Sequence, residues 1–263
     1  MEHVESFDGQ ERDSSFAEVD AVRGELASTG KLRVGIVSAP AVSTFFVAVD
    51  ESNIPHGPTV DIGEELARVL GVPVEFFVVP NSGELPGAIE RGVIDVAFMP
   101  IDDERKKRVD FGPSYFLIES TALVQDKSAF QVTSDLNRDG VRVVGISNTT
   151  TIRTAAKVLD AATIFPVPSV GEAMDKLRDG HAEAVALSRD VLLTYQARIP
   201  GTRILDGSLH STGVGIAVAK GRPIALLYVS AFLETAKSSG FIRQAFDRAN
   251  LHSDHVAPSE RGK

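Results

Sequence analysis

Arg105 is the residue whose type and position most strongly predict a binding site in this sequence. It follows the apolar segment 94–99 by a few positions and begins a polar stretch, so we expect it beyond the end of a strand. A planar guanidinium can bind a carboxylate through two charge-assisted hydrogen bonds. The alternative is a surface ion pair with Asp102 or Glu104, which would contribute little. The residues alone leave both interpretations open.

Three consecutive threonines form a second candidate site. Thr149, Thr150 and Thr151 follow the apolar segment 141–146 and precede a helical pattern that begins at Ile152. Hydroxyl groups and free backbone N–H groups at a helix N-terminus can bind an anion. Simple N-capping needs only one threonine, so three in succession favour contact with a ligand.

Ser188, Arg189 and Asp190 follow the apolar segment 182–187 in the same way. We expect one of them to point into a cleft, and the alternative is a turn with a surface pair between the arginine and the aspartate.

Phe45 and Phe46 could form a wall of a pocket. Adjacent aromatic residues are more often divided between core and surface, so this interpretation competes with a structural one.

Other chemistry is not indicated. Only two of the six histidines, His252 and His255, lie close together, which is too few ligands for a zinc site. The absence of cysteine excludes disulfides and thiolate chemistry. The sequence contains no glycine-rich phosphate loop and no nucleophile elbow. We therefore expect no metal, no cofactor and no catalytic residue.

Composition narrows the class of protein. The 263 residues are 43% hydrophobic and 24% charged, which is usual for a globular protein, and no apolar run approaches the roughly 20 residues of a membrane span. A net charge of −9 argues against a nucleic-acid partner. The first 30 residues are acidic and polar, without the apolar segment of a signal peptide. On these residues the chain is either a mature exported protein or a cytoplasmic one.

Strand and helix patterns alternate along the chain, which is typical of a largely parallel sheet covered on both faces by helices. Strands are expected at residues 32–37, 74–79, 94–99, 141–146, 163–166, 182–187 and 212–218, and helices at residues 16–27, 60–70, 84–91, 152–159, 170–177, 223–238 and 241–249.

The order of elements repeats within the chain. Residues 90–97 resemble residues 178–185: in both, a helix ends at a glycine, an acidic residue follows three positions later, and a short apolar strand begins. Two similar lobes explain the repeat. Ligands of such sheets bind beyond the carboxyl ends of the strands, which places Met99 and Pro100 opposite Ser188 across a cleft.

The predicted fold is therefore α/β, with two Rossmann-like lobes joined by a hinge of two crossings, whose bending would enclose a ligand. Lobe 1 comprises residues 31–118 and 211–252, lobe 2 comprises residues 123–206, and polar tails occupy residues 1–30 and 253–263.

Several motifs resemble those of the bacterial extracellular solute-binding proteins of family 3, which serve ABC importers of polar amino acids. The motifs are GVIDVA at residues 92–97, Glu104-Arg105, VDFGPSY at residues 109–115, and the Thr150-Thr151 pair, and the likeness extends from about residue 32 to residue 251. It implies a type II periplasmic binding protein fold. It also implies that Arg105 holds a ligand carboxylate while Thr150 or Thr151 assists from the other lobe. The implied protein is periplasmic and delivers an amino acid or related carboxylate to ABC permease subunits. We expect a monomer by default.

The chain departs from the family pattern at the other end of the ligand. Ser188 stands near the position of an aspartate that holds the ligand ammonium group, and Pro100 replaces a serine or threonine. The stacking aromatic of the family aligns with Ser43. We infer a ligand that lacks an α-ammonium group or holds it differently, with Asp102 or Asp190 as possible substitutes.

Two other functions use the same predicted fold. A cyclohexadienyl dehydratase would need a cleft acid or base, for which Asp102, Asp103 and Asp190 are the candidates. A ligand-sensing domain would signal through a partner, but no DNA-binding module precedes residue 31 and no membrane span adjoins it.

Overall fold

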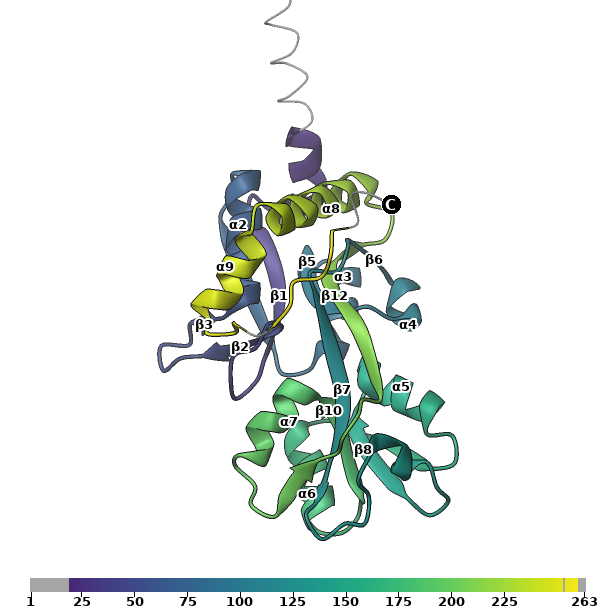
Figure 1. Ribbon diagram of the computed structural model, residues 1–263. Helices are drawn as coiled ribbons and strands as arrows, with labels where there is room; N and C mark the ends of the chain where they lie inside the picture. The colour runs from purple at the N-terminus through teal and green to yellow at the C-terminus, as the bar shows by residue number, and fades with distance from the viewer. Residues whose placement is uncertain (1–18, 253, 260–263) are drawn as a thin grey trace, which may run out of the picture.

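The computed structural model describes residues 19–252 and 254–259. The helix predicted at residues 16–27 is present over residues 19–26, and its first residues lie outside the described part, as do most of the residues of the two predicted tails. The described chain forms two lobes, with strands β7 (Phe116–Gln125) and β12 (His210–Ala219) running between them (Figure 1). None of the described helices is both long enough and apolar enough to cross a bilayer.

Lobe 1 is built around strand β1 (Leu32–Ser38), which pairs in parallel with three neighbours. These neighbours are β2 (Phe46–Val49), β4 (Val74–Val79) and β5 (Val96–Pro100). The short strands are β3 (Pro55–His56) and β6 (Val109–Phe111). The helices are α2 (Pro58–Leu70), α3 (Leu85–Glu90), α4 (Asp103–Lys106), α8 (Pro223–Ser238) and α9 (Phe241–Arg248).

Lobe 2 repeats the pattern around β8 (Arg142–Ile146), which lies between two parallel neighbours, β9 (Thr163–Val167) and β10 (Ala184–Ser188). Its helices are α5 (Thr150–Val158), α6 (Val170–Arg178) and α7 (Arg189–Gln196), and a short strand β11 (Thr202–Ile204) pairs with β7. The predicted α/β class is confirmed, but the short elements β2, β3, β6, β11 and α4 were not expected, and two longer elements also differ from expectation. Strand β7 was expected only as a crossing, and α7 begins where a turn was one alternative.

Strands β7 and β12 belong to the sheets of both lobes. They pair with each other antiparallel where residues 116–120 meet residues 210–214. Beyond that pairing β7 continues beside β10, and β12 continues beside β5. The buried apolar residues form one cluster in lobe 1 and two in lobe 2, so each lobe has its own core on its own side of this strand pair.

The same hydrogen-bonded clamp occurs once in each lobe. In lobe 1, Arg33 donates from its backbone N–H (2.9 Å), Nε (2.9 Å) and Nη2 (2.6 Å) to the Asp95 carboxylate, and from Nη1 to the Gly92 carbonyl. In lobe 2, Arg142 binds Glu183 through its backbone N–H (2.7 Å), Nε (3.1 Å) and Nη2 (2.7 Å), and also reaches the Gly180 carbonyl. These are the glycines and acidic residues of the sequence repeat, so the repeat encodes a clamp that joins the first and third predicted strands of each lobe.

Loss of the carboxylate charge should cost more stability in lobe 1 than in lobe 2. The Asp95 side chain is 7% exposed and that of Glu183 is 32% exposed, so water screens the second clamp more strongly. We expect Asp95→Asn to lower the free energy of unfolding by about 1–3 kcal/mol, and Glu183→Gln to lower it by under about 1 kcal/mol. Urea denaturation measures both, with Glu75→Gln in the exposed Lys31–Glu75 pair as the control. Equal losses would contradict the dependence on burial.

Candidate functional site

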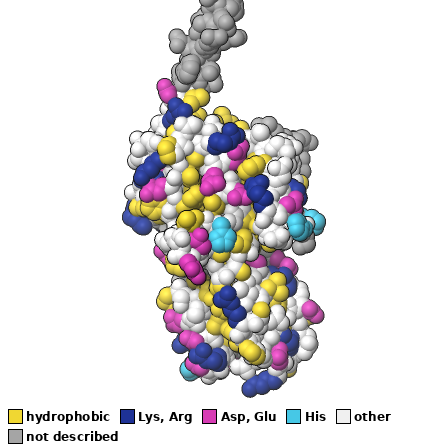
Figure 2. All heavy atoms as spheres, turned by 90° about the vertical axis from the view of Figure 1, so that its left-hand side faces the viewer, with side chains coloured by type: hydrophobic (Ala, Val, Ile, Leu, Met, Phe, Trp, Pro, Cys, Tyr) yellow, Lys and Arg dark blue, Asp and Glu magenta, His cyan; other side chains and the backbone are white. Residues whose placement is uncertain are grey.

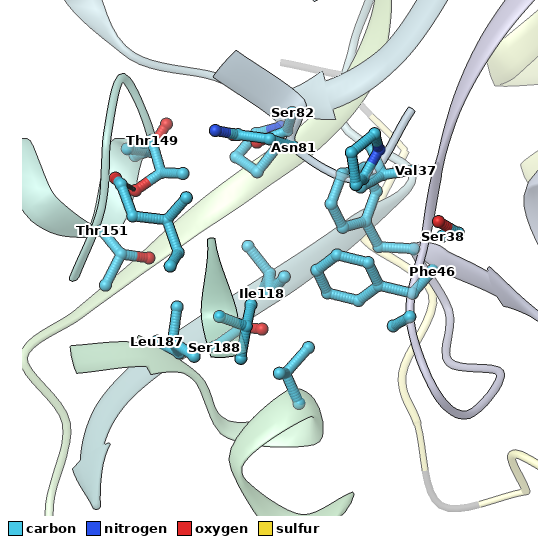
Figure 3. A pocket seen from close by; sticks show the side chains of 18 of the residues that line it. Val37, Ser38, Phe46, Asn81, Ser82, Ile118, Thr149, Thr151, Leu187 and Ser188 are labelled. Atoms are coloured by element: carbon cyan, nitrogen blue, oxygen red, sulfur yellow. Dashed lines mark hydrogen bonds between the residues drawn. The ribbon is translucent and has the colours of Figure 1, made fainter. Parts of the chain in front are cut away.

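A cavity of about 420 Å³ lies between the lobes, at the carboxyl ends of strands from both sheets. Lobe 1 contributes residues at or just after the ends of β1, β4 and β5, and lobe 2 contributes residues at or just after the ends of β8, β9 and β10. Ile118 and Ser120 of β7 and Thr212 of β12 complete the lining from the hinge. Figure 3 shows Asn81 and Ser82 on one side, Thr149 and Thr151 on a second, and Phe46 on a third.

Phe45 and Phe46 both line the cavity, with ring centroids 4.6 Å apart in an edge-on arrangement. Phe45 is fully buried, and Phe46 also packs against the apolar cluster of lobe 2. The loop that carries them is fixed from two sides. The Ser43 hydroxyl accepts hydrogen bonds from both phenylalanine N–H groups, and the buried Tyr115 phenol donates to the Thr44 carbonyl (2.9 Å). Ser43, which aligns with the stacking aromatic of the family, therefore shapes the turn. The aromatic surface of the cavity comes from Phe46 instead.

The three threonines all line the cavity, but their side chains have different partners. Thr149 is the N-cap of α5 and accepts from the Ile152 N–H (3.3 Å). The Thr150 hydroxyl donates to Asp102 across the lobes (2.9 Å), and the Thr151 hydroxyl shares a hydrogen bond with Ser120 (2.9 Å). One threonine, Thr149, is enough to cap the helix. The Thr150 hydroxyl therefore contacts lobe 1, and the Thr151 hydroxyl contacts Ser120 beside the cavity.

Arg105 is 2% exposed and does not itself line the cavity. Helix α4 turns its side chain back, so that Nη1 donates to the Pro100 carbonyl (2.8 Å) and Nη2 donates to the Ser82 hydroxyl (2.9 Å). Both partners are lining residues, so the guanidinium lies directly behind the cavity wall rather than reaching into the gap as expected. The alternative of a surface pair is wrong as well, because Glu104 binds Lys107 and only the Arg105 backbone meets the Asp102 carboxylate.

Burial leaves the Arg105 cation short of partners. Its Nε–H is buried without a hydrogen-bond partner among the described residues, and those residues include no carboxylate in ion-pair contact with its guanidinium. Burial lowers the pKa of Arg105 to about 9, although the nearby Asp102 acts in the opposite direction. At neutral pH the group is still protonated, so a buried positive charge stands beside the cavity.

Of the remaining predicted site residues, some line the cavity and others do not. Pro100 and Ser188 line the cavity, whereas Met99 and Asp190 do not. Met99 precedes Pro100 on β5, where successive side chains point to opposite faces, so it lies in the core of lobe 1. Asp190 sits in the first turn of α7, where one carboxylate oxygen accepts from the Val191 N–H. The alternative of a surface Arg189–Asp190 pair is not found, because Arg189 forms an ion pair with Glu119 (2.8 Å).

All the described side chains that line the cavity are uncharged. The polar ones are hydroxyls and one amide, apart from which the wall is apolar. Across the described chain no group of three or more potential ligands could hold a metal ion. The cavity can therefore bind a small solute by shape, hydroxyl contacts and the adjacent buried cation.

Asp102 joins the lobes beside this cavity. One of its carboxylate oxygens accepts the Arg105 N–H (2.8 Å) and thereby caps α4, and the other accepts from the Thr150 hydroxyl and from Nε (3.0 Å) and Nη2 of Arg153. Burial raises the pKa of Asp102, but these hydrogen bonds outweigh burial and hold it below its usual range. The carboxylate is thus ionised at neutral pH and forms a latch between α4 and α5.

The lobes also meet closely at Gly83 of the 3-10 helix Ser82–Glu84. A Cβ atom at this glycine would lie 2.7 Å from Asn148 Cβ and 3.0 Å from the Ser147 carbonyl oxygen in lobe 2. Next to it, the Asn81 amide donates to the same Ser147 carbonyl (3.2 Å). The structure is therefore a closed form in which lobe 1 and lobe 2 touch on this side of the cavity.

Sequence reasoning missed several lining residues, among them Asn81, Ser82, Ser120 and Thr212. Asn81 and Ser82 follow the predicted strand 74–79, so the rule of strand carboxyl ends points to them as well. Ser120 and Thr212 lie on the hinge strands, and no signal in the sequence places a crossing segment against a ligand.

Neutralising the latch should favour the open form. Asp102→Asn keeps an oxygen to cap α4 but removes the charge that Arg153 binds, and we expect a ligand that requires closure to bind about fivefold more weakly. Isothermal titration calorimetry measures the change. Glu104→Gln, which removes a carboxylate from an exposed pair on the same helix, is the control. An unchanged Asp102→Asn affinity would refute the latch.

A methyl group at Gly83 should hold the lobes apart without unfolding either of them. Because the chain contains no cysteine, spin labels on cysteines introduced at the exposed positions Lys106 and Lys157 can report the distance between lobes. We expect Gly83→Ala to lengthen this distance, and Gly24→Ala, which meets nothing within 4 Å, to leave it unchanged. Identical distances in both variants would show that closure does not depend on this contact.

Comparison with known proteins agrees with this geometry. The family described as bacterial extracellular solute-binding proteins, family 3, matches residues 33–250. A glutamine-binding protein of Geobacillus stearothermophilus is 27% identical over 201 residues, which are 74% of this chain and 75% of that protein. The ABC transporter glutamine-binding protein GlnH of Bacillus subtilis (strain 168) is 26% identical over 190 residues, or 70% of this chain and 69% of that protein.

Solved structures show the same relationship. Holo ArgBP from T. maritima superposes with a TM-score of 0.70 at 30% identity, covering 86% of this chain and 98% of that one. An ancestral amino acid-binding protein, AncCDT-1, described as a precursor of cyclohexadienyl dehydratase, gives a TM-score of 0.70 at 29% identity, with 86% and 97% coverage. Because the family match spans most of the sequence, this chain belongs to the family 3 bacterial extracellular solute-binding proteins.

Proposed function

We propose that this protein captures a small carboxylate-bearing solute, an amino acid or a related organic acid, and delivers it to an ABC permease. Membership of a solute-binding family supports the general role, and relatives named for glutamine and arginine support the size and class of ligand. The closed lobes around a cavity of about 420 Å³ suit a ligand of that size.

The observation that supports a carboxylate group in the ligand is the buried guanidinium of Arg105. Its two side-chain hydrogen bonds go to neutral acceptors, Ser82 and Pro100, and these two residues separate it from the cavity. A buried cation without an ion-pair partner is costly, and an anion in the cavity reduces that cost. The Nε–H that lacks a partner adds a donor that a small shift of the Ser82 segment would direct at a carboxylate.

Hinge closure gives the protein a form that a permease can distinguish. Ligand contacts from both lobes exist together only when the lobes are closed, so the ligand stabilises that form. The family description names extracellular proteins, and we propose that this chain acts outside the cytoplasm, in the periplasm, as a monomer. On the face in Figure 2, basic and acidic side chains of the described residues are interspersed over both lobes, which suits a small-molecule partner better than a nucleic acid.

A catalytic role is less compatible with the site. A dehydratase would need an acid or base at the ligand with a pKa near the working pH. Asp102 has a lowered pKa and is fully engaged by the latch, while Asp103 is exposed and Asp190 lies off the cavity. We therefore propose binding without turnover. Incubation with prephenate, followed by its ultraviolet spectrum, tests this, and any steady conversion would refute it.

Replacing Arg105 should abolish tight binding. In a thermal-shift screen of amino acids and organic acids, the proposed ligand raises the melting temperature with its concentration over Kd. For the best ligand we expect Arg105→Ala to weaken binding by roughly 30-fold or more, because the carboxylate then lacks its cation. We expect Arg105→Lys to recover part of the loss.

Lys106→Ala is the matched control, since this exposed lysine lies next to Arg105 on α4. Calorimetry measures the affinities, and circular dichroism verifies that each variant is folded. An unchanged affinity in folded Arg105→Ala would disprove the role of the guanidinium.

A further inference from the structure

We infer that the cavity selects a monocarboxylate without a positive charge, an α-oxo or α-hydroxy acid with an uncharged side chain, over the corresponding zwitterionic amino acid. This inference rests on the proposed function, because it takes a carboxylate near Arg105 as given. It concerns the other substituents of the ligand, which the remaining walls of the cavity must accommodate.

The lining offers no compensation for an ammonium group. All of its described side chains are uncharged, and those around Ser188 are hydroxyls and apolar groups (Figure 3). An ammonium group carries three donors and no acceptor, and its charge needs a carboxylate when it leaves water. Hydroxyl oxygens can accept its hydrogen bonds, but they leave the charge unpaired.

The nearest carboxylates do not line the cavity. Both oxygens of Asp102 are already used, one by the Arg105 N–H and the other by Thr150 and Arg153. Glu119 is held by Arg189, and Asp190 does not line the cavity, although its Oδ2 is buried without a hydrogen-bond partner among the described residues and would need a shift of the first turn of α7 to meet a ligand. An amino acid would have to break the interlobe latch to recruit Asp102, at the cost of the closed form that encloses it.

The charges beside the cavity also oppose a second cation. Arg153 is paired with Asp102, whereas the buried guanidinium of Arg105 makes no ion pair with any described carboxylate, so its positive charge lacks a direct partner. A ligand with one carboxylate and no other charge balances it. A zwitterion brings no net charge, so it leaves the excess in place and adds repulsion in a region of low dielectric constant.

The neutral groups suit the body of such an acid. Ser188 is buried at the end of β10, and its hydroxyl makes no hydrogen bond to any described residue, while Thr151 and Ser120 share one. Hydroxyls can donate to an oxo oxygen or accept from a ligand hydroxyl. Phe46, Leu187 and Val191 provide an apolar surface for the side chain.

Matched titrations of the full chain test this inference. Each set contains an amino acid with its α-oxo and α-hydroxy analogues: L-alanine with pyruvate and L-lactate, L-phenylalanine with phenylpyruvate and phenyllactate, and L-leucine with α-ketoisocaproate and α-hydroxyisocaproate. In every set that binds, we expect the oxo or hydroxy acid to bind about 10- to 100-fold more tightly. An amino acid that binds as tightly as its analogues overturns the inference and leaves the proposed function intact. Failure of every compound in all sets overturns the inference, whereas the proposed function fails only if the wider thermal-shift screen of amino acids and organic acids also finds no ligand.

A carboxylate placed in the lining should reverse the preference. We expect Ser188→Asp to weaken binding of the oxo acid and to strengthen binding of the matched amino acid. Ser188→Asn, of similar size but neutral, is the control and should leave the preference for the oxo acid in place. If both variants change the two affinities by the same factor, shape rather than charge governs selection and the inference fails. The wild-type titrations decide the matter even if a variant does not fold.

Discussion

The antiparallel pairing of β7 with β12 holds the two lobes together and sets the axis about which they can move. Each strand is shared, because β7 runs on beside β10 and β12 runs on beside β5. A bend between the lobes must therefore change the backbone close to Ser120 and Thr212, which line the cavity. Hinge position and ligand contact are coupled by this shared backbone, without any further element to transmit the change.

Around that hinge the charged groups are arranged outside a neutral cavity. Arg105 lies behind Ser82 and Pro100, and Asp102 and Arg153 join the lobes beside them. In a buried region such charges act over several ångströms, so they affect the electrostatic potential inside the cavity without direct contact with the ligand. Specificity then has two sources. The surrounding charges set the net charge of the ligand, and the hydroxyl and apolar lining sets its shape and hydrogen bonding.

The sequence predicted the repeated parts of this protein better than its connecting parts. Apolar segments located β1, β4 and β8, and the glycine-to-acid spacing of the repeat corresponds to the twin clamps of Arg33 and Arg142. Strand β7 was not predicted as a strand, because it changes partners midway and mixes Glu119 with apolar neighbours, so no single period describes it. Its pairing depends on distant segments, because it pairs with β10, β11 and β12, which all lie 60 or more positions further along the chain.

For the site, strand-end reasoning placed Pro100, Ser188 and the three threonines at the cavity, and the structure brings them together. It failed for Met99, since alternation along β5 sends that side chain to the core. The burial of the Arg105 side chain behind the cavity wall could not be predicted from the sequence either. Whether a guanidinium reaches into a cleft or folds back behind its wall depends on the single turn of α4 and on where the Ser82 hydroxyl lies.

The latch contributes to closure, and the ligand supplies the variable part of the balance between open and closed forms. The side chains of Asp102 and Arg153 are 17% and 26% exposed, so water and salt screen part of their attraction. Because the pKa of Asp102 is lowered in the folded protein, the contribution of its charge is present above the pKa of the free side chain, about 4, and is lost only as the pH falls through the lower folded value. Near neutral pH the latch is therefore constant. The variable that shifts the equilibrium is then a carboxylate that neutralises the uncompensated guanidinium when both lobes surround it.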